Sequence, residues 1–140
     1  MTSKHVDLGC GAVARHPYNH DEVHAVDLAA PSGTAPHLFR QANLSLAPVP
    51  HPDSTFDSAS AFNFLEHIPR ILPTPDGRST RFPFVELMNE IHRTLKLGGQ
   101  EDFVPGSALG LRGKLRKWRL KRAGRLSHLV WEFVCIKGAP

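Results

Sequence analysis

The sequence predicts one α/β domain of the nucleotide-binding kind, on three observations. Residues 5–11, HVDLGCG, indicate a short buried strand that runs into a glycine turn. Residues 22–28, EVHAVDL, form a second short apolar run, and its acid Asp27 follows Asp7 by 20 residues. Residues 82–96 carry apolar side chains at the spacing of an amphipathic helix.

The bulk properties exclude several classes of protein. A length of 140 residues favours a single domain, 1–140, and 41% hydrophobic residues indicate a globular chain. No apolar run reaches 18 residues and none of signal-peptide length precedes the first strand, so we expect no integral membrane segment. Cys10 and Cys135 are far apart, which favours free thiols in a reducing cytoplasm, and the nine scattered histidines predict no metal site.

The glycine turn and the two acids predict a ligand site at the carboxyl ends of the first two strands. Gly9 and Gly11 permit positive φ and let a ligand approach the backbone closely. Asp7 ends the first strand, where open α/β sheets bind ligands. Asp27 is expected at the tip of the next strand, where an acid in dinucleotide-binding folds accepts hydrogen bonds from the two ribose hydroxyls. The alternative is that Asp27 only caps a turn.

Five segments in order extend this pattern to a family resemblance. DLGCG, AVDL, FRQANL, FDSASAFNFLEHI and FVELMNEIHRTLKLGG together resemble the class I S-adenosylmethionine-dependent methyltransferases, from about His5 to Gly99. The resemblance implies a doubly wound, mostly parallel Rossmann-like sheet, S-adenosyl-L-methionine as cofactor, and a small-molecule methyl acceptor. The methyl group would move by in-line displacement, assisted chiefly by alignment.

The resemblance also implies the cofactor-binding residues. Asp7, Gly9 and Gly11 would hold the methionine end, and Asp27, with Leu28 beside it, the ribose.

The remaining cofactor contacts come from the next two strand ends. Asn43 and Leu44 would hold the adenine, although Asn43 is equally well explained as an Asx-turn residue. Phe62 and Asn63 would line the pocket.

Glu66 and His67 are the candidate catalytic residues. They follow the fourth expected strand, 56–62, on the substrate side, and a histidine there can act as a general base. The alternative is that both side chains only hold their loop in place.

The connections are expected to be short. Pro17 interrupts any helix over 12–21, and 28–37 and 45–54 have loop compositions around a third strand at 38–42. Residues 69–81 indicate a surface excursion, and the helix over 82–96 is expected to end with Gly98 at C′.

The second part of the chain, 100–140, departs from the family pattern. Residues 100–105, QEDFVP, make a poor buried fifth strand, whereas 126–137 indicate a strand. We therefore expect a complete cofactor-binding half, 1–99, a reduced C-terminal part, and a homodimer that covers the exposed edge.

The segment 111–125 carries eight cations in fourteen residues around a helical apolar spacing. It is interpreted as a solvated surface helix, a nucleic-acid contact or a membrane-surface helix, in that order.

Three functions are compatible with these patterns. The first is a small methyltransferase. The second is an inactive, shortened relative that binds cofactor or nucleic acid. The third, a nicotinamide-dependent oxidoreductase, is disfavoured because GCGAVA lacks the last glycine of the dinucleotide pattern.

Overall fold

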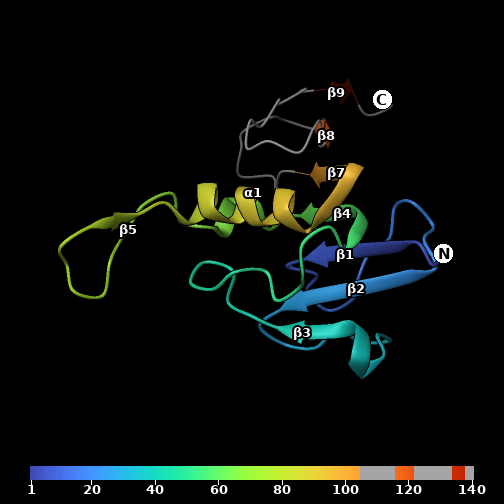
Figure 1. The fold of residues 1–140 in the computed structure, drawn as a ribbon, viewed down its shortest axis with the longest axis horizontal. Coiled ribbons are helices and arrows are strands. Elements are labelled where there is room, and N and C mark those ends of the chain that lie inside the picture. The colour runs from blue at the N-terminus through green and yellow to red at the C-terminus, as the bar shows by residue number, and fades with distance from the viewer. Residues whose placement is uncertain (105–115, 122–133, 138–140) are drawn as a thin grey trace.

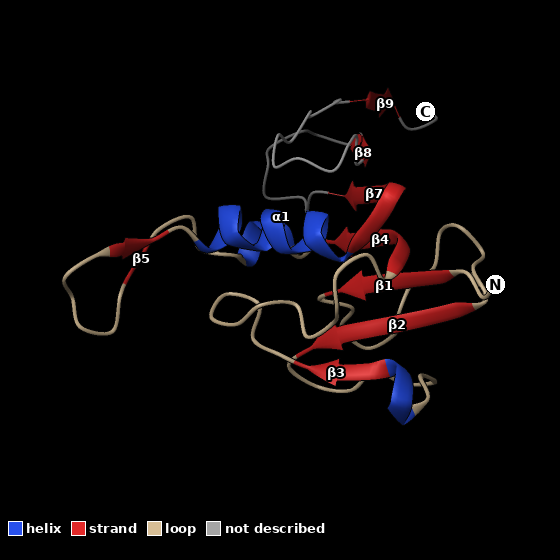
Figure 2. Ribbon diagram, in the orientation of Figure 1, coloured by secondary structure: helices blue, strands red, loops and turns tan. Residues whose placement is uncertain are grey.

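The computed structural model describes residues 1–104, 116–121 and 134–137, with side chains through residue 97. Figures 1 and 2 show a twisted sheet with one α-helix against it and a narrow arm that projects from the body. The elements in chain order are β1 (Lys4–Leu8), β2 (Glu22–Asp27), the 3₁₀ turn η1 (Pro36–Leu38), β3 (Phe39–Gln41), β4 (Phe56–Phe62), the 3₁₀ turn η2 (Leu65–His67), β5 (Leu72–Pro73), β6 (Thr80–Arg81), α1 (Pro83–Thr94), β7 (Leu95–Val104), β8 (Arg116–Lys121) and β9 (Val134–Lys137).

The main sheet has the order β3-β2-β1-β4-β7-β8-β9. Its first five strands are parallel, and β8 and β9 are each antiparallel to the strand before them. The strand order reverses direction between β1 and β4, which is the switch point where such sheets bind ligands. The expected Rossmann-like, mostly parallel α/β fold is confirmed.

The two faces of the sheet differ in chemistry. Val6 and Leu8 alternate with His5 and Asp7 along β1, and all four are at most 1% exposed. The apolar face packs against α1 through Leu87 and other buried apolar side chains of that helix. The opposite face is polar, because the register sets His5 and Asp7 beside the serines of β4.

The connections are as short as the sequence predicts. Residues 9–21 form no helix between β1 and β2, and a single 3₁₀ turn precedes β3. Residues 69–81 form the arm, whose strands β5 and β6 pair antiparallel (Figure 1). Pro83 lies in the first turn of α1, as expected. None of the described helices has the length and apolar character needed to cross a membrane.

Arg93, near the end of α1, fixes the loop over residues 45–54. Its guanidinium donates to the carbonyl oxygens of Val49 and His51 at 3.0 and 2.9 Å and to the Asp53 carboxylate at 2.7 Å. Glu90 accepts a hydrogen bond from the Val49 amide at 3.0 Å. This loop therefore has a defined position although it contains no regular secondary structure.

The prediction that residues 100–105 make no central strand is wrong. β7 continues to Val104 and pairs in parallel with β4, from Gln100 beside Ser58 to Val104 beside Phe62. β8 pairs with its other edge and sets Arg119 opposite Asp102. Pairing on both edges overrides the weak strand propensity of an acidic segment.

The expected end of the helix also needs correction. Gly98 is not the C′ residue of the helix, because α1 ends at Thr94 and the chain enters β7 at Leu95. Gly98 lies where the β4–β7 register shifts, between Leu95 and Gln100.

The basic segment is not a helix over the part that the structure describes. Residues 116–121 form strand β8, and 111–115 and 122–125 lie outside the described residues. Of the strand expected over 126–137, β9 forms Val134–Lys137, and 126–133 lie outside the described residues.

Candidate functional site

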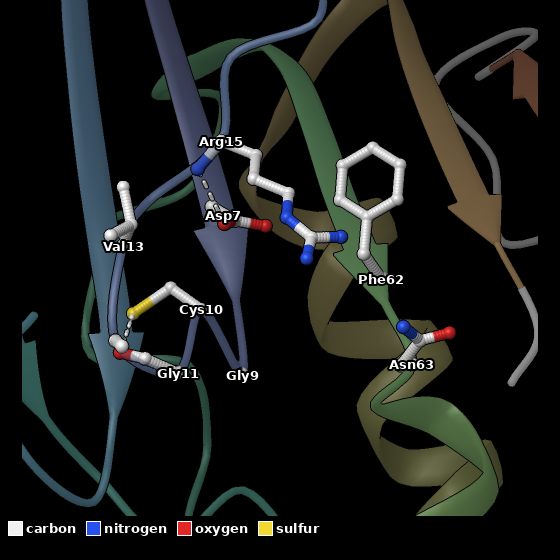
Figure 3. A pocket seen from close by; sticks show the side chains of 9 residues that line it. Asp7, Gly9, Cys10, Gly11, Val13, Arg15, Phe62 and Asn63 are labelled. Atoms are coloured by element: carbon white, nitrogen blue, oxygen red, sulfur yellow. Dashed lines mark hydrogen bonds between the residues drawn. The ribbon is translucent and has the colours of Figure 1, made fainter.

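A hollow of about 360 Å³ lies at the carboxyl ends of β1 and β4, within the size range of small-molecule sites. Because β1, β2 and β4 are parallel, their carboxyl ends meet at one edge of the sheet. The lining residues, all drawn in Figure 3, are Asp7, Gly9, Cys10, Gly11, Ala12, Val13, Arg15, Phe62 and Asn63. Five of these, Asp7, Gly9, Gly11, Phe62 and Asn63, are cofactor-binding residues predicted from the sequence.

The two glycines of the turn serve different purposes. Both have positive φ, 62° at Gly9 and 65° at Gly11. A Cβ on Gly9 would lie 2.1 Å from Cδ2 of Phe64, whereas a Cβ on Gly11 would meet nothing within 4 Å. Gly9 is therefore required by packing, and Gly11 leaves its side of the turn open to a ligand.

Asp27 joins the tip of β2 to the glycine turn. Its Oδ2 accepts a hydrogen bond from the Gly11 amide at 2.7 Å, and its Oδ1 accepts one from the Leu28 amide at 2.6 Å. The Gly9 amide donates to the carbonyl of Val26 at 2.9 Å and holds the turn against β2. The carboxylate thus lies beside the hollow without lining it.

Asp7 is a buried acid at the floor of the hollow, with 1% of its surface exposed. Its Oδ1 accepts from the Ser60 hydroxyl at 2.7 Å and its Oδ2 from the Arg15 amide at 2.8 Å. Burial raises the pKa of the Asp7 carboxyl to about 6, although these hydrogen bonds and the Arg15 charge oppose the rise.

A chain of buried polar groups continues from Asp7 across the polar face of the sheet. Ser60 also contacts Nε2 of His5 at 2.8 Å, and Nδ1 of His5 contacts the Ser58 hydroxyl at 2.6 Å. Since the Ser60 hydrogen is donated to Asp7, Ser60 accepts from His5, so Nε2 carries the hydrogen. In its neutral form His5 then accepts at Nδ1 from Ser58. The rings of Tyr18 and His20 lie over His5, each with its centroid 6.1 Å away.

Asn63 and Arg15 form the far wall of the hollow. Asn63 has a φ of 51°, in the left-handed region that asparagine tolerates better than most residues. The Arg15 guanidinium carbon lies 5.1 Å from the centroid of the Phe62 ring, and Figure 3 shows the side chain between Asp7 and Phe62. Sequence reasoning missed Arg15 and Val13, because a loop without periodicity gives no sign of which side chains point inward.

Besides Asp27, three predicted cofactor residues lie outside the lining of the hollow. Leu28 is 60% exposed, and Leu44 is 6% exposed within the hydrophobic core. The Asn43 Oδ1 accepts from the Ser45 amide at 3.1 Å, which is the Asx turn considered as its alternative.

Glu66 and His67 also lie outside that lining, in η2 beyond the end of β4. His67 is exposed, and Glu66 is half-buried with an Oε2 that has no hydrogen-bond partner among the described residues. No described contact joins either residue to Asp7 or the glycine turn.

The site offers no metal-binding cluster within the described part of the chain, where no three His, Cys, Asp or Glu side chains gather suitably. Cys10 is a free cysteine. Burial, and after it the charge of Asp27, raises the pKa of the Cys10 thiol to about 12, so the thiol is a poor nucleophile at neutral pH.

Comparison with known proteins finds similar solved structures. No family model and no curated protein matches the chain. Similar structures include an arsenic(III) S-adenosylmethionine methyltransferase from Chlamydomonas reinhardtii (18% identity, TM-score 0.49), the YcgJ protein from Bacillus subtilis (19%, 0.44) and an S-adenosylmethionine-dependent methyltransferase from Methanosarcina mazei (22%, 0.43). Each match covers 74% of this chain and, respectively, 38%, 44% and 52% of the other.

The chain spans only about half, or less, of those proteins. The strand order and register of the main sheet show the fold of this chain.

Proposed function

We propose that this chain binds S-adenosyl-L-methionine at the carboxyl edge of β1, β2 and β4 and transfers its methyl group to a small-molecule acceptor. The observation that carries the proposal is the hydrogen bond between the Asp27 carboxylate and the Gly11 amide. It sets an acid at the tip of β2 directly beside a glycine turn that lines a hollow. An acid and a glycine turn side by side suit a nucleoside ligand. The acid accepts hydrogen bonds from the ribose hydroxyls, and the turn, which has no Cβ at its glycines, leaves room for the group attached to the 5′ carbon.

The donors and acceptors of the site fit this ligand. Asp27 Oδ1 accepts one backbone hydrogen bond and keeps a second lone pair for a ribose hydroxyl. Oδ2 accepts from the Gly11 amide and, at 3.9 Å, from the Cys10 thiol, a weak donor that a second ribose hydroxyl would replace. Leu28, exposed beside it, offers apolar surface to the ribose. Asp7 supplies a negative charge for the ammonium of the methionine end.

The adenine end is proposed to lie along the turn after β3. Asn43 is exposed, and its carboxamide still has a free lone pair and two N–H donors beyond the bond to Ser45. Leu44 would contribute through its backbone, because its side chain is committed to the core.

The protein's part in the reaction is positioning. The cofactor, when bound, supplies an electrophilic methyl group. Phe62 and Asn63 would orient it at the end of β4, and the hollow limits the directions of approach. Glu66 and His67, next along the chain, are proposed to receive a proton from the acceptor. The alternative of an inactive relative was favoured by the poor fifth strand and by the basic segment 111–125. β7 occupies the position of the fifth strand, which removes the first of these two grounds.

Calorimetry with S-adenosyl-L-methionine tests the proposal. We expect a Kd near or below about 100 μM, which corresponds to roughly −5.5 kcal/mol. Asp27→Asn keeps an acceptor for the Gly11 amide but loses the charge and the acceptor for the Leu28 amide, and should weaken binding by about tenfold or more.

Asp76→Asn, in the turn of the arm, is the matched control and should bind as the wild type does. A folded wild-type protein that binds no S-adenosyl-L-methionine would contradict the proposal. If the protein binds S-adenosyl-L-methionine but transfers its methyl group to none of a panel of small-molecule acceptors, the proposed cofactor site stands and the proposed enzymatic activity is contradicted.

A further inference from the structure

The polar face of the sheet carries a chain of four buried side chains, of which the proposed reaction uses only Asp7. Asp7, His5, Ser58 and Ser60 are each at most 1% exposed. The parallel register of β1 and β4 sets His5 beside Ser58 and Asp7 beside Ser60. The contacts are 2.6 Å from Ser58 Oγ to His5 Nδ1, 2.8 Å from His5 Nε2 to Ser60 Oγ, and 2.7 Å from Ser60 Oγ to Asp7 Oδ1. The histidine is thus joined to the acid by a continuous path of hydrogen bonds.

The direction of these hydrogen bonds depends on the charge of Asp7. An ionised carboxylate only accepts, so every hydrogen bond of the chain points toward Asp7 and the hydrogen of His5 lies on Nε2. A protonated Asp7 carries its hydrogen on Oδ1, because Oδ2 faces the Arg15 amide, which is itself a donor. The Ser60 hydroxyl then accepts from Asp7 and donates to Nε2, and the hydrogen of His5 lies on Nδ1.

The two arrangements differ by one proton, and the heavy atoms keep their places. From the ionised to the protonated form, each hydrogen of the chain passes to the next atom toward Asp7, and a proton from the solvent replaces the hydrogen of Ser58. The imidazole ring has one hydrogen in both forms and stays neutral, as suits a side chain with no exposed surface. Both forms are populated near neutral pH, because burial raises the pKa of Asp7 to about 6.

We propose that His5 is a positioning residue for Asp7. Acting through Ser60, the Nε2–H form of the ring holds the hydroxyl hydrogen on the carboxylate and favours its charge, and the ring changes tautomer when the carboxylate takes up a proton. Hydrogen bonds that point the same way polarise one another, so the whole chain stabilises the anion. The coupling follows from the contacts alone. Its use in the reaction rests on the proposed function, which needs Asp7 as an anion.

Other groups that titrate or carry charge face the same chain. They are Arg15, Tyr18 and His20 from the loop after β1, Asp27 at the tip of β2, and Asp102, whose register position on β7 is beside Ser60. The β2 residues in register with the chain, Val23 and Ala25, are apolar. His20 is the competing cause of a pH-dependent change at His5, since the two rings are stacked with their centroids 6.1 Å apart.

Nuclear magnetic resonance of the protein without ligand tests the inference, with ¹⁵N in the histidine rings and ¹³C in the aspartate carboxyl groups. A ring nitrogen that carries a hydrogen differs clearly in chemical shift from one that does not, so the spectrum reports the tautomer directly. We expect the hydrogen of His5 on Nε2 above pH 6 and on Nδ1 below it, with the same midpoint as the carboxyl carbon of Asp7. A histidine with a purely structural role would keep one tautomer through this titration.

Variants at both ends of the Ser60 link separate the coupling from other causes. In Asp7→Asn the carbonyl oxygen has to face the Arg15 amide, so the NH₂ group donates to Ser60 and fixes the hydrogen of His5 on Nδ1 at every pH. Ser60→Ala removes the link, so the tautomer should no longer follow Asp7. The pKa of Asp7 should rise in this variant, because its charged form loses a donor. Ser60→Thr keeps the hydroxyl and should keep the coupling.

Two control variants should titrate as the wild type does. His20→Gln removes the competing ring, and Ser79→Ala removes an exposed hydroxyl in the arm. Thermal unfolding checks that each variant is folded. If Ser60→Ala does not fold, the titrations of the wild type and of Asp7→Asn decide the question.

Three results would overturn the inference. They are a single tautomer of His5 through the titration, a hydrogen on both ring nitrogens at neutral pH, and a tautomer change that persists in Asp7→Asn or is lost in His20→Gln. None of these results bears on the binding of S-adenosyl-L-methionine, which calorimetry measures separately. Coupling in a folded protein that binds no S-adenosyl-L-methionine would support this inference and overturn only the proposed function.

Discussion

Replacing Gly9 by alanine should destabilise the protein far more than the same change at Gly11. Both positions have φ near +60°, where a Cβ costs about 1–2 kcal/mol. At Gly9 the new Cβ would also lie 2.1 and 2.2 Å from Cδ2 and Cγ of Phe64, and 2.8 Å from its Cβ. Even the base of the Phe64 side chain is too near, so a ring rotation alone cannot relieve the contact.

The magnitudes follow from these two terms. Overpacking of a well-packed site costs typically about 1–3 kcal/mol, so Gly9→Ala should lower the free energy of unfolding by about 2–5 kcal/mol. Gly11→Ala should lower it by only about 1–2 kcal/mol, because its Cβ meets nothing within 4 Å. For a domain of this size each kcal/mol lowers Tm by roughly 3 °C.

Urea unfolding of both variants, in the wild type and in a Phe64→Gly background that removes the Phe64 Cβ as well as the ring, measures these terms. The cost of Gly9→Ala should fall to the φ term once Phe64 is removed, while that of Gly11→Ala should stay the same. Equal losses for the two glycines, or a Gly9→Ala cost that does not depend on Phe64, would refute the reasoning.

Four other predictions concern charge, core and assembly. Asp7 has a folded pKa of about 6, above its unfolded value, so it favours folding at low pH and this contribution is lost as pH rises through 6. Asp7→Asn should therefore raise Tm at pH 7.5 relative to the wild type, while abolishing S-adenosyl-L-methionine binding measured by calorimetry. His51 has the opposite sign: burial lowers its pKa to about 4, so stability should fall as pH drops from 6.5 towards 4, and His51→Gln should flatten that part of a plot of Tm against pH. Leu87→Ala, at a side chain that is 2% exposed, should lower the urea-derived free energy of unfolding by about 2–5 kcal/mol, in contrast to a small effect of Val85→Ala on the exposed side of α1. The homodimer expected from the sequence stays a prediction, and a monomer in sedimentation velocity would remove it.

The sequence predicts the parts of this fold that depend on local patterns. The apolar runs that end in Asp7 and Asp27 are strands, and the stripe through Leu87 and Ile91 is the buried face of α1. β7 could not be predicted, because its acidic segment is a strand only through pairing with β4 on one edge and β8 on the other. Those partners are distant in sequence, and local propensity does not include them.

The sequence predicts the part of the hollow's lining that lies at the ends of β1 and β4 and in the glycine turn, and not the part that lies in the following loop. Gly9 and Gly11 are predicted to form a turn because glycine adopts positive φ without steric cost. Arg15 follows a glycine turn without a helix, so no periodicity shows where its side chain points. The sequence shows that Ser58 and Ser60 lie on the same face of β4, because they are two residues apart. It does not show that Ser60 lies beside Asp7, because that depends on the register between β1 and β4.

The polar face of the sheet explains how Asp7 can be buried at the floor of a binding site. The Ser60 hydroxyl and the Arg15 amide hold one carboxylate oxygen each, so the orientation of the group is fixed before a ligand arrives. These two neutral donors do not offset the loss of water, since burial still raises the pKa to about 6. The charge of Arg15 offsets part of this loss, and a further cation bound in the hollow would add to it and favour the ionised carboxylate. Near pH 6 the site is therefore arranged so that proton release and the binding of an ammonium group assist each other.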